Sequence, residues 1–199
     1  MTNSLPTVTV DIQGNTNGGG QGAGSITYYG GSNQVKLTKE ESPQGSGFVK
    51  LKHTSASVAP GGLFNVKEVK YGHTPASDIK PTNNEPIKSH SVWYHSGDKD
   101  HNKPLLVEIW EKGGTFKYHE TKGGATSWNS HDNGSTSQLT GKELEQKLKN
   151  LNCQHYKSVN IDLTESHSKK LTEDILAGTT TTTTTTNYLP RTYRIVICA

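Results

Sequence analysis

Two histidines and two aspartates, residue types that bind metals or transfer protons, lie close together in the stretch WYHSGDKDHNKPLLVEIW. These four residues are His95, Asp98, Asp100 and His101. Imidazole nitrogens and carboxylate oxygens are ligands that zinc takes in catalytic sites. His119, in the next strand-like run, would supply a further nitrogen. The cluster is therefore a candidate zinc site, and the polar turn of a β-hairpin is the alternative.

Known metal-binding sequence patterns do not fit this cluster. Asp98, Asp100 and Asn102 match the first, third and fifth positions of a calcium-binding EF-hand loop, but Lys103 stands where that loop requires glycine. The twelfth position holds Ile109 instead of glutamate. The histidine spacing matches neither H-E-x-x-H nor a Cys/His zinc pattern. The favoured interpretation is a polar turn in which Asp and Asn stabilise the bend, and no cofactor is expected.

Residues for acid–base or nucleophilic catalysis do not form a recognisable motif. Glu108, Glu111 and Glu120 fall on predicted strands or turns. Strand alternation directs Glu108 away from the core if Val107 faces it. No G-x-S-x-G motif is present, and Cys153 is interpreted as a small hydrophobic residue at a helix end. The chain is therefore not expected to be an enzyme.

The aromatic side chains suggest a different kind of site, a ligand-binding face. The candidates are Trp93, Tyr94, Trp110 and Trp128. Aromatic rings of this kind line protein- and sugar-binding surfaces. Alternation along the strands places Trp93 and Trp110 on the face opposite Val92, where coverage by a helix is favoured over exposure.

Charge and composition exclude several classes of partner. The net charge is +3 and the two signs are interleaved, as in KLTKEE and KELEQKLK, which is typical of a solvated surface. No nucleic-acid partner is therefore expected. Two cysteines are too few for a disulfide framework. The N-terminal MTNSLPTVTV lacks the features of a signal peptide, and no apolar run has membrane-spanning length, so no membrane span is expected.

Short runs of alternating apolar and polar residues predict β-strands along most of the chain. The runs are VTVDI (Val8–Ile12), SITYY (Ser25–Tyr29), QVKLT (Gln34–Thr38), GFVKLKH (Gly47–His53), LFNVKEVKY (Leu63–Tyr71), SVWYH (Ser91–His95), LLVEIW (Leu105–Trp110) and TFKYHE (Thr115–Glu120). Residues Thr140–Cys153 predict a helix, because Leu144, Leu148 and Leu151 share one face. We predict an α+β, mainly β fold with antiparallel β-meanders, one C-terminal amphipathic helix packed on the sheet, and a disordered tail.

The composition also predicts how the chain is divided. Residues 1–71 form a β-rich half-unit with a Gly-rich loop at 14–24, residues 72–90 a linker or long loop, and residues 91–163 a second β-rich half-unit with the helix at 140–153. Residues 164–199 form a low-complexity tail that contains eight consecutive threonines. GFVKLKHT (Gly47–Thr54) resembles GTFKYHET (Gly114–Thr121), and VTVDI recurs as VNIDL (Val159–Leu163). These internal similarities favour related halves within a repeat unit.

The order of these motifs resembles a known group of protein families. An aromatic pair, a Gly/Asp turn, KPLLVEI, GGTFKYHE, a later Trp, LKNLNC and VNIDLT follow one another between Val8 and Thr164. This order is similar to that of repeat units in the expanded protein families of piroplasm parasites of the Theileria type, in the style of the FAINT modules. The resemblance implies a non-enzymatic, β-rich module from a secreted or parasite-surface antigen family. The chain departs from it in lacking a recognisable signal peptide and in ending its second unit in the threonine tract.

We therefore expect a host–parasite interaction protein that binds an unknown host protein or glycan. The alternative is a carbohydrate-binding β-module, in which the tryptophans would contact the sugar. A third hypothesis is a metal-dependent hydrolase that uses His95 and His101 with the neighbouring aspartates.

Overall fold

The computed structural model describes residues 4–14, 24–57, 60–82, 85–131 and 137–156, together with two short strands near the C-terminus. The chain divides into two compact units, Met1–Tyr156 and Lys157–Ala199. In the second unit, β11 (Ile161–Asp162) pairs antiparallel with β12 (Arg194–Ile195). The threonine tract and most of the predicted tail at 164–199 lie outside the described residues.

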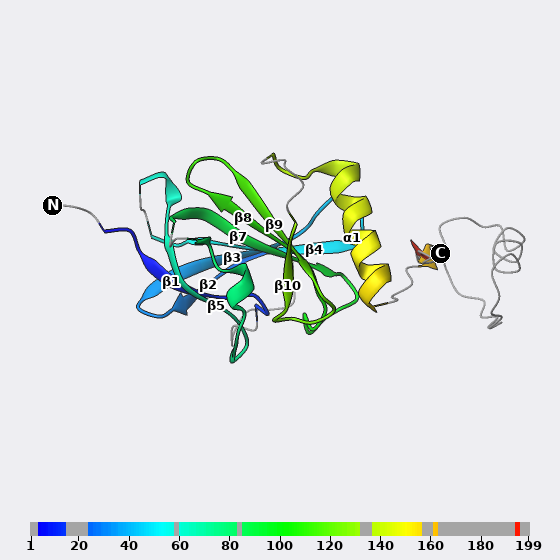
Figure 1. Ribbon diagram of the computed structural model, residues 1–199, viewed down its shortest axis with the longest axis horizontal. Helices are drawn as coiled ribbons and strands as arrows, with labels where there is room; N and C mark the ends of the chain where they lie inside the picture. Colours follow the sequence, from blue (N-terminus) through cyan, green and yellow to red (C-terminus); the bar gives the residue numbers. More distant parts are fainter. Residues whose placement is uncertain are drawn as a thin grey trace, which may run out of the picture. The chain divides into compact units, whose positions relative to one another are not determined.

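A seven-stranded sheet forms the centre of the first unit (Figure 1). In their order across the sheet, the strands are β10 (Trp128–His131), β9 (Phe116–Thr121), β8 (Pro104–Glu111), β7 (Ile87–His95), β4 (Phe48–Ser55), β3 (Asn33–Glu41) and β2 (Gly24–Gly30). Every neighbouring pair is antiparallel. Two meanders, β2–β4 and β7–β10, are joined where β4 pairs with β7. The predicted fold class, mainly β with one helix packed on the sheet, is confirmed.

A smaller sheet contains the one parallel pairing among the described strands. It consists of β1 (Thr7–Asp11), β5 (Asn65–Tyr71) and β6 (Thr74–Pro75), with β1 parallel to β5. A parallel pair needs a long crossover connection, and here the crossover contains the first meander. β1 passes so close to the large sheet that a Cβ atom on Gly30 would lie 2.4 Å from the carbonyl oxygen of Thr9.

The core between the two sheets is built from the alternating apolar residues that predicted the strands. Its buried members are Val8, Val10, Ile12, Val35, Leu37, Leu51, Phe64, Val66, Val69, Ala76, Ile79, Ile87, Val92, Tyr94, Val107, Ile109 and Trp128. Three of them, Ala76, Ile79 and Ile87, come from residues 72–90, which the sequence suggested as a linker. That segment holds β6, the 3-10 helix η2 (Ser77–Ile79) and the first residues of β7. Another 3-10 turn, η1, spans Pro60–Gly62.

A second core lies on the other face of the large sheet, beneath α1 (Gly141–Tyr156). Leu144, Leu148 and Leu151 of α1 are buried there, as their spacing along one helix face predicts. They pack with Phe48, Trp93, Leu105, Leu106, Tyr118 and Leu139. Figure 1 shows α1 running across the direction of the strands at one end of the sheet. The rest of this face is therefore not covered by the helix.

Candidate binding surface on the helix-bearing face of the sheet

The polar turn between β7 and β8 is held together by its own side chains. The carboxylate of Asp98 accepts hydrogen bonds from the backbone N–H groups of Asn102, at 3.0 Å, and Lys103, at 2.7 Å. His101 adopts a positive φ of 53°. Its Nδ1 lies 2.9 Å from the carbonyl oxygen of Gln13, so the turn is fastened to the end of β1.

The four predicted metal ligands do not form a ligand set. Nδ1 of His95 accepts a hydrogen bond from the backbone N–H of Gly97 at 3.1 Å, and its ring packs edge-on against Phe48. Asp100 is exposed, and its carbonyl oxygen accepts a bond from Gln13 Nε2 at 3.5 Å. Across the described parts of the chain, no three His, Cys, Asp or Glu side chains are grouped so that they could hold a metal ion.

Three of the four predicted aromatic site residues are buried. Trp93 is 0% exposed and donates from Nε1 to the carbonyl oxygen of Ser42 at 3.0 Å. Tyr94 is also 0% exposed, and its hydroxyl donates to the carbonyl oxygen of Ile12 at 2.8 Å. Trp128 is buried and belongs to the core between the two sheets. Because buried rings cannot contact a ligand on the surface, only the half-buried Trp110 remains available among these four residues, and its Nε1 atom is buried.

Trp110 is surrounded by an aromatic ring and two ammonium groups. Its ring stacks on Phe116 of β9, with centroids 5.5 Å apart and an interplanar angle of 11°. The Nζ atom of Lys88 lies 4.4 Å from the centroid of the Trp110 ring, and that of Lys52 lies 5.9 Å from it. Both distances are within the range of a cation–π interaction. A register shift between Ile87 and Ser89 accompanies the approach of Lys88 to the ring.

The strand register extends this surface to the edge of the sheet. Lys52 lies opposite Thr38, and Lys36 lies opposite Thr54, so both lysines lie on the face that carries Trp110. Tyr29, opposite Gln34, is on the same face and is 72% exposed. We define the lysine–aromatic face as Tyr29, Lys36, Lys52, Lys88, Trp110 and Phe116. α1 covers the neighbouring part of this side of the sheet, around Trp93 and Tyr118.

The lysine–aromatic face carries an excess of positive charge. None of Lys36, Lys52 and Lys88 has an ion-pair partner among the residues that the structure describes. Of the nearby carboxylates, Glu108 is paired with Lys50 at 3.0 Å and Glu111 with Lys117 at 2.7 Å, while the exposed Glu40 lies on the same face as a diagonal neighbour of Lys52. Between the lysines and Trp110, the register places the buried side chains of Ser89 and Ser91. Their hydroxyl oxygens have no hydrogen-bond partner within the described part of the protein.

As strand alternation predicts, the side chain of Glu108 lies on one face of the sheet, and those of Val107 and Ile109 lie on the other face. It is nevertheless only 1% exposed, because α1 and the segment before it close over this part of the sheet. Its carboxylate accepts hydrogen bonds from the Tyr118 hydroxyl at 2.8 Å and from Lys50. Burial and the neighbouring carboxylate raise the pKa of Tyr118 above its usual value. This is a structural network in which Glu108 is fully engaged.

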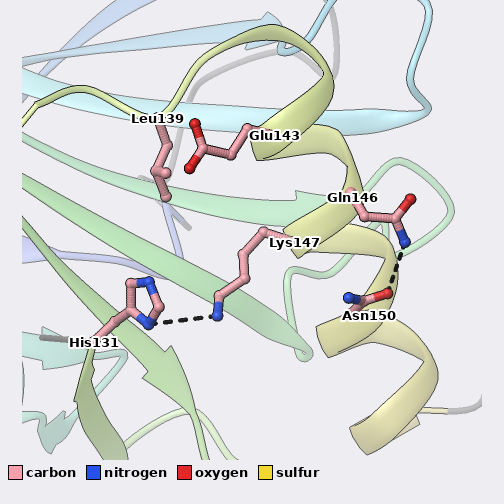
Figure 2. A pocket seen from close by; sticks show the side chains of 6 residues that line it. All are labelled: His131, Leu139, Glu143, Gln146, Lys147 and Asn150. Atoms are coloured by element: carbon pink, nitrogen blue, oxygen red, sulfur yellow. Dashed lines mark hydrogen bonds between the residues drawn. The ribbon is translucent and has the colours of Figure 1, made fainter. Parts of the chain in front are cut away.

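A hollow of about 350 Å³ lies between α1 and β10 (Figure 2). It is lined by His131, Leu139, Glu143, Gln146, Lys147 and Asn150. Lys147 points toward His131, and both contact the carboxylate of Glu120, the Lys147 Nζ at 2.5 Å. Gln146 and Asn150 bond to one another at 2.8 Å. Four of the five polar side chains that line the hollow are therefore engaged, which makes it a weaker candidate than the lysine–aromatic face.

Two fully buried histidines lie in the core between the sheets. Nδ1 of His53 is 3.1 Å from the Tyr28 hydroxyl, and Nε2 of His90 is 3.0 Å from the carbonyl oxygen of Ile79. Burial, with a smaller contribution from His90, lowers the pKa of His53 to about 3. Burial lowers the pKa of His90 to about 4, against a smaller opposing effect of its bond to Ile79. Both are therefore neutral packing residues near pH 7, which the sequence did not predict.

Cys153 is half-buried on α1 and is disulfide-bonded, so it is not a free thiol. No described helix has the length and hydropathy needed to cross a membrane. Comparison with protein-family models, with curated proteins and with solved structures finds no match to the chain.

Of the four aromatic candidates, Trp110 lies on the lysine–aromatic face, and the lysines around it were not predicted. A signal was present in β4, where FVKLKHTS places Lys50 and Lys52 on the face opposite the apolar Val49 and Leu51. The position of Lys88 carries no such signal, because a register shift breaks the alternation there.

Proposed function

We propose that the chain is a non-enzymatic binding module and that it binds a host macromolecule through the lysine–aromatic face. The resemblance of its motif order to that of secreted and surface-exposed piroplasm proteins supports a location at the host–parasite interface. The face itself presents ammonium groups, the exposed ring of Tyr29 and threonine hydroxyls, which can pair with charged and polar groups of a ligand. Its residues lie on neighbouring strands of one sheet, an arrangement that suits an extended partner.

One observation carries the proposal: Lys88 and Lys52 both approach Trp110 on an exposed sheet face and have no carboxylate partner among the described residues. An unpaired cluster of like charges raises the energy of the free protein, and an anionic partner would lower it. Trp110 adds a large, partly rigid contact surface of the kind enriched at binding sites.

The experiment is a cell-binding measurement with the full chain. Fluorescently labelled protein is added to host cells, and the bound fraction is measured by flow cytometry. Lys52→Glu with Lys88→Glu is expected to lower the binding at least about tenfold, since reversal converts two attractive charges into repulsive ones. The matched control is Lys67→Glu with Lys122→Glu, because both lysines are exposed and lie outside the face.

The control variant carries the same change of net charge, so it separates the face from the overall charge of the protein. Binding by the control equal to that of the original chain, with loss in the Lys52 and Lys88 variant, supports the proposal. Equal loss in both variants, or no loss in either, contradicts it. Circular dichroism spectra and thermal midpoints of the variants show whether each remains folded.

A carbohydrate-binding β-module is the alternative function, and Trp110 with Phe116 is the observation that favours it. If the chain has this function, the sugar would pack against the accessible parts of the Trp110 and Phe116 rings. Stacking of an uncharged sugar on the ring of Trp110 is less favoured, since Phe116 lies against that ring and Lys88 approaches it. Fluorescence titration of the chain with neutral oligosaccharides tests this alternative.

A further inference from the structure

We infer that the ligand of the lysine–aromatic face is an anionic polysaccharide, a chain of sulfated or carboxylated sugars. This inference rests on the proposed function and specifies the chemical class of its ligand. It is drawn from three features of the face: the spacing of its charges, the hydroxyl groups between them, and the occupied surroundings of the Trp110 ring.

The charges come from three neighbouring strands: Lys52 and Lys88 both lie near the Trp110 ring, and Lys36 lies beside Lys52 on the next strand. Lys36 on β3 and Lys52 on β4 are diagonal neighbours, because Lys36 lies opposite Thr54, two residues beyond Lys52. Diagonal positions of this kind are about 7–8 Å apart. Lys88 reaches the same area from β7, over Trp110. Two ammonium groups at Trp110 with a third beside them on the next strand match a polymer with repeated anionic groups better than a single phosphate or carboxylate.

Hydroxyl groups lie between these charges. Thr38 and Thr54 are half-buried and lie directly opposite Lys52 and Lys36, and the Thr54 hydroxyl donates to the carbonyl oxygen of Lys36 at 3.5 Å. Hydroxyl groups both donate and accept hydrogen bonds, as the hydroxyl, sulfate and carboxylate groups of a sugar chain require. Lysine binds sulfate or carboxylate as a compact charge on a flexible stem, which suits a ligand with variable spacing between its charges.

The rings of this face offer single-stranded nucleic acid, the other extended polyanion, one open stacking surface, Tyr29, instead of a series of them. Binding of that kind depends on bases that stack on open aromatic faces. The ring of Trp110 is already stacked on Phe116, and Lys88 lies 4.4 Å from its centroid. The ring of Trp110 therefore helps to hold an ammonium group in place. The ligand would contact the ammonium and hydroxyl groups of the face instead of the face of this ring.

The experiment uses heparin as the sulfated probe and measures its affinity for the full chain by isothermal titration calorimetry. We expect saturable binding that weakens as salt is raised, because salt screens the charges. Lys52→Glu with Lys88→Glu is expected to abolish binding. The milder Lys52→Gln with Lys88→Gln is expected to weaken it about thirtyfold, from about 1 kcal/mol for each lysine near an anionic surface. This second variant also covers the case in which charge reversal impairs folding.

Controls decide whether the binding is specific to this face and to a glycan. The Lys67→Glu with Lys122→Glu variant is expected to bind heparin within about twofold of the original chain, since a mutation remote from the contact leaves the local charges unchanged. Equal weakening in both charge-reversal variants overturns the inference, because it indicates binding by net charge. Competition with heparin by polyglutamate at equal charge concentration also overturns the inference, in favour of an acidic protein. Competition by polyuridylate overturns it in favour of a nucleic acid.

The failure of this inference is distinguishable from the failure of the proposed function. If host-cell binding depends on Lys52 and Lys88 while heparin does not bind the original chain, the ligand class is wrong and the binding face stands. If heparin binding is unaffected by substitution of Lys52 and Lys88 and cell binding is unaffected as well, both are wrong.

Discussion

Lys50 of β4 and Glu108 of β8 form an ion pair at 3.0 Å across the intervening strand β7, although their side chains are only 8% and 2% exposed. The Nζ atom of Lys50 also lies 4.5 Å from the centroid of the Trp93 ring. Glu108 is bonded to the hydroxyl of Tyr118, which in turn accepts a hydrogen bond from the backbone N–H of Leu139 at 2.8 Å. The pair therefore connects the centre of the sheet to the segment that leads into α1.

Removal of one partner of this pair is expected to be strongly destabilising. Lys50→Met leaves the carboxylate of Glu108 buried without its counter-ion, and we expect the free energy of unfolding to fall by about 3–5 kcal/mol. Urea denaturation at pH 7 measures the change. Lys122→Met, at an exposed position, is the control and is expected to change the stability by less than about 0.5 kcal/mol.

The double variant Lys50→Met with Glu108→Gln tests the cause of this loss. Because it removes both charges, it is expected to be more stable than Lys50→Met alone. A double variant at least as unstable as the single one would show that packing, and not the unpaired charge, accounts for the effect.

The buried histidines are expected to make the first unit sensitive to acid. The pKa of His53 is lowered to about 3 and that of His90 to about 4, whereas the ordinary value is 6.5. Below pH 6.5 the unfolded chain therefore binds protons that the folded protein does not. The contribution of the two neutral histidines to the free energy of unfolding is fully present above pH 6.5. It is lost as the pH falls toward 4, by about 1.4 kcal/mol per pH unit for each histidine.

Urea denaturation at pH 7, 6 and 5 measures this slope. Burial also lowers the pKa values of His101 and His119, so they contribute in the same direction. His90→Asn removes one buried site and is expected to make the slope shallower, while His73→Asn, at an exposed position, leaves it unchanged. A slope that is the same in all three proteins would contradict the assignment of the acid sensitivity to the core histidines.

The close approach of β1 to the large sheet predicts the effect of a single methyl group. Gly30→Ala would place a Cβ atom 2.4 Å from the carbonyl oxygen of Thr9 and 2.9 Å from Val35 Cγ2. We expect β1 to be displaced and the free energy of unfolding to fall by about 1–3 kcal/mol. Gly24→Ala, on the same strand, is the control because a Cβ atom there meets nothing within 4 Å. Thermal or urea denaturation that ranks the two variants equally would contradict this packing.

Local sequence patterns were sufficient to predict most strands, the helix and the fold class, because alternation and leucine spacing are properties of single segments. They did not predict which strands become neighbours. The parallel pairing of β1 with β5 joins residues that are more than fifty positions apart, and nothing local in VTVDI specifies that partner. The apolar residues of 72–90 were hidden for a related reason: Ala76, Ile79 and Ile87 are isolated among polar residues and follow no period.

Local sequence patterns also could not predict which of the aromatic candidates would be exposed. Alternation placed Trp93 and Trp110 on the same face of the sheet, and the structure has both there. Their exposure differs because α1 covers one end of that face and leaves the other uncovered, and the position of the helix cannot be read from strand alternation. The buried His53 and His90 follow the inward positions of their strands, but a polar residue at such a position is usually assigned to the surface.

The three tryptophans are expected to differ in their access to solvent, and acrylamide quenching of fluorescence measures this. Trp93 and Trp128 are at most 3% exposed, whereas Trp110 is half-buried and the most accessible of the three. Trp110→Phe should therefore remove most of the quenchable emission, because only the two buried rings remain. Trp93→Phe is the matched control and should leave that quenchable emission in place. Stronger protection from acrylamide in the Trp93 variant than in the Trp110 variant would contradict the assignment of Trp110 to the lysine–aromatic face.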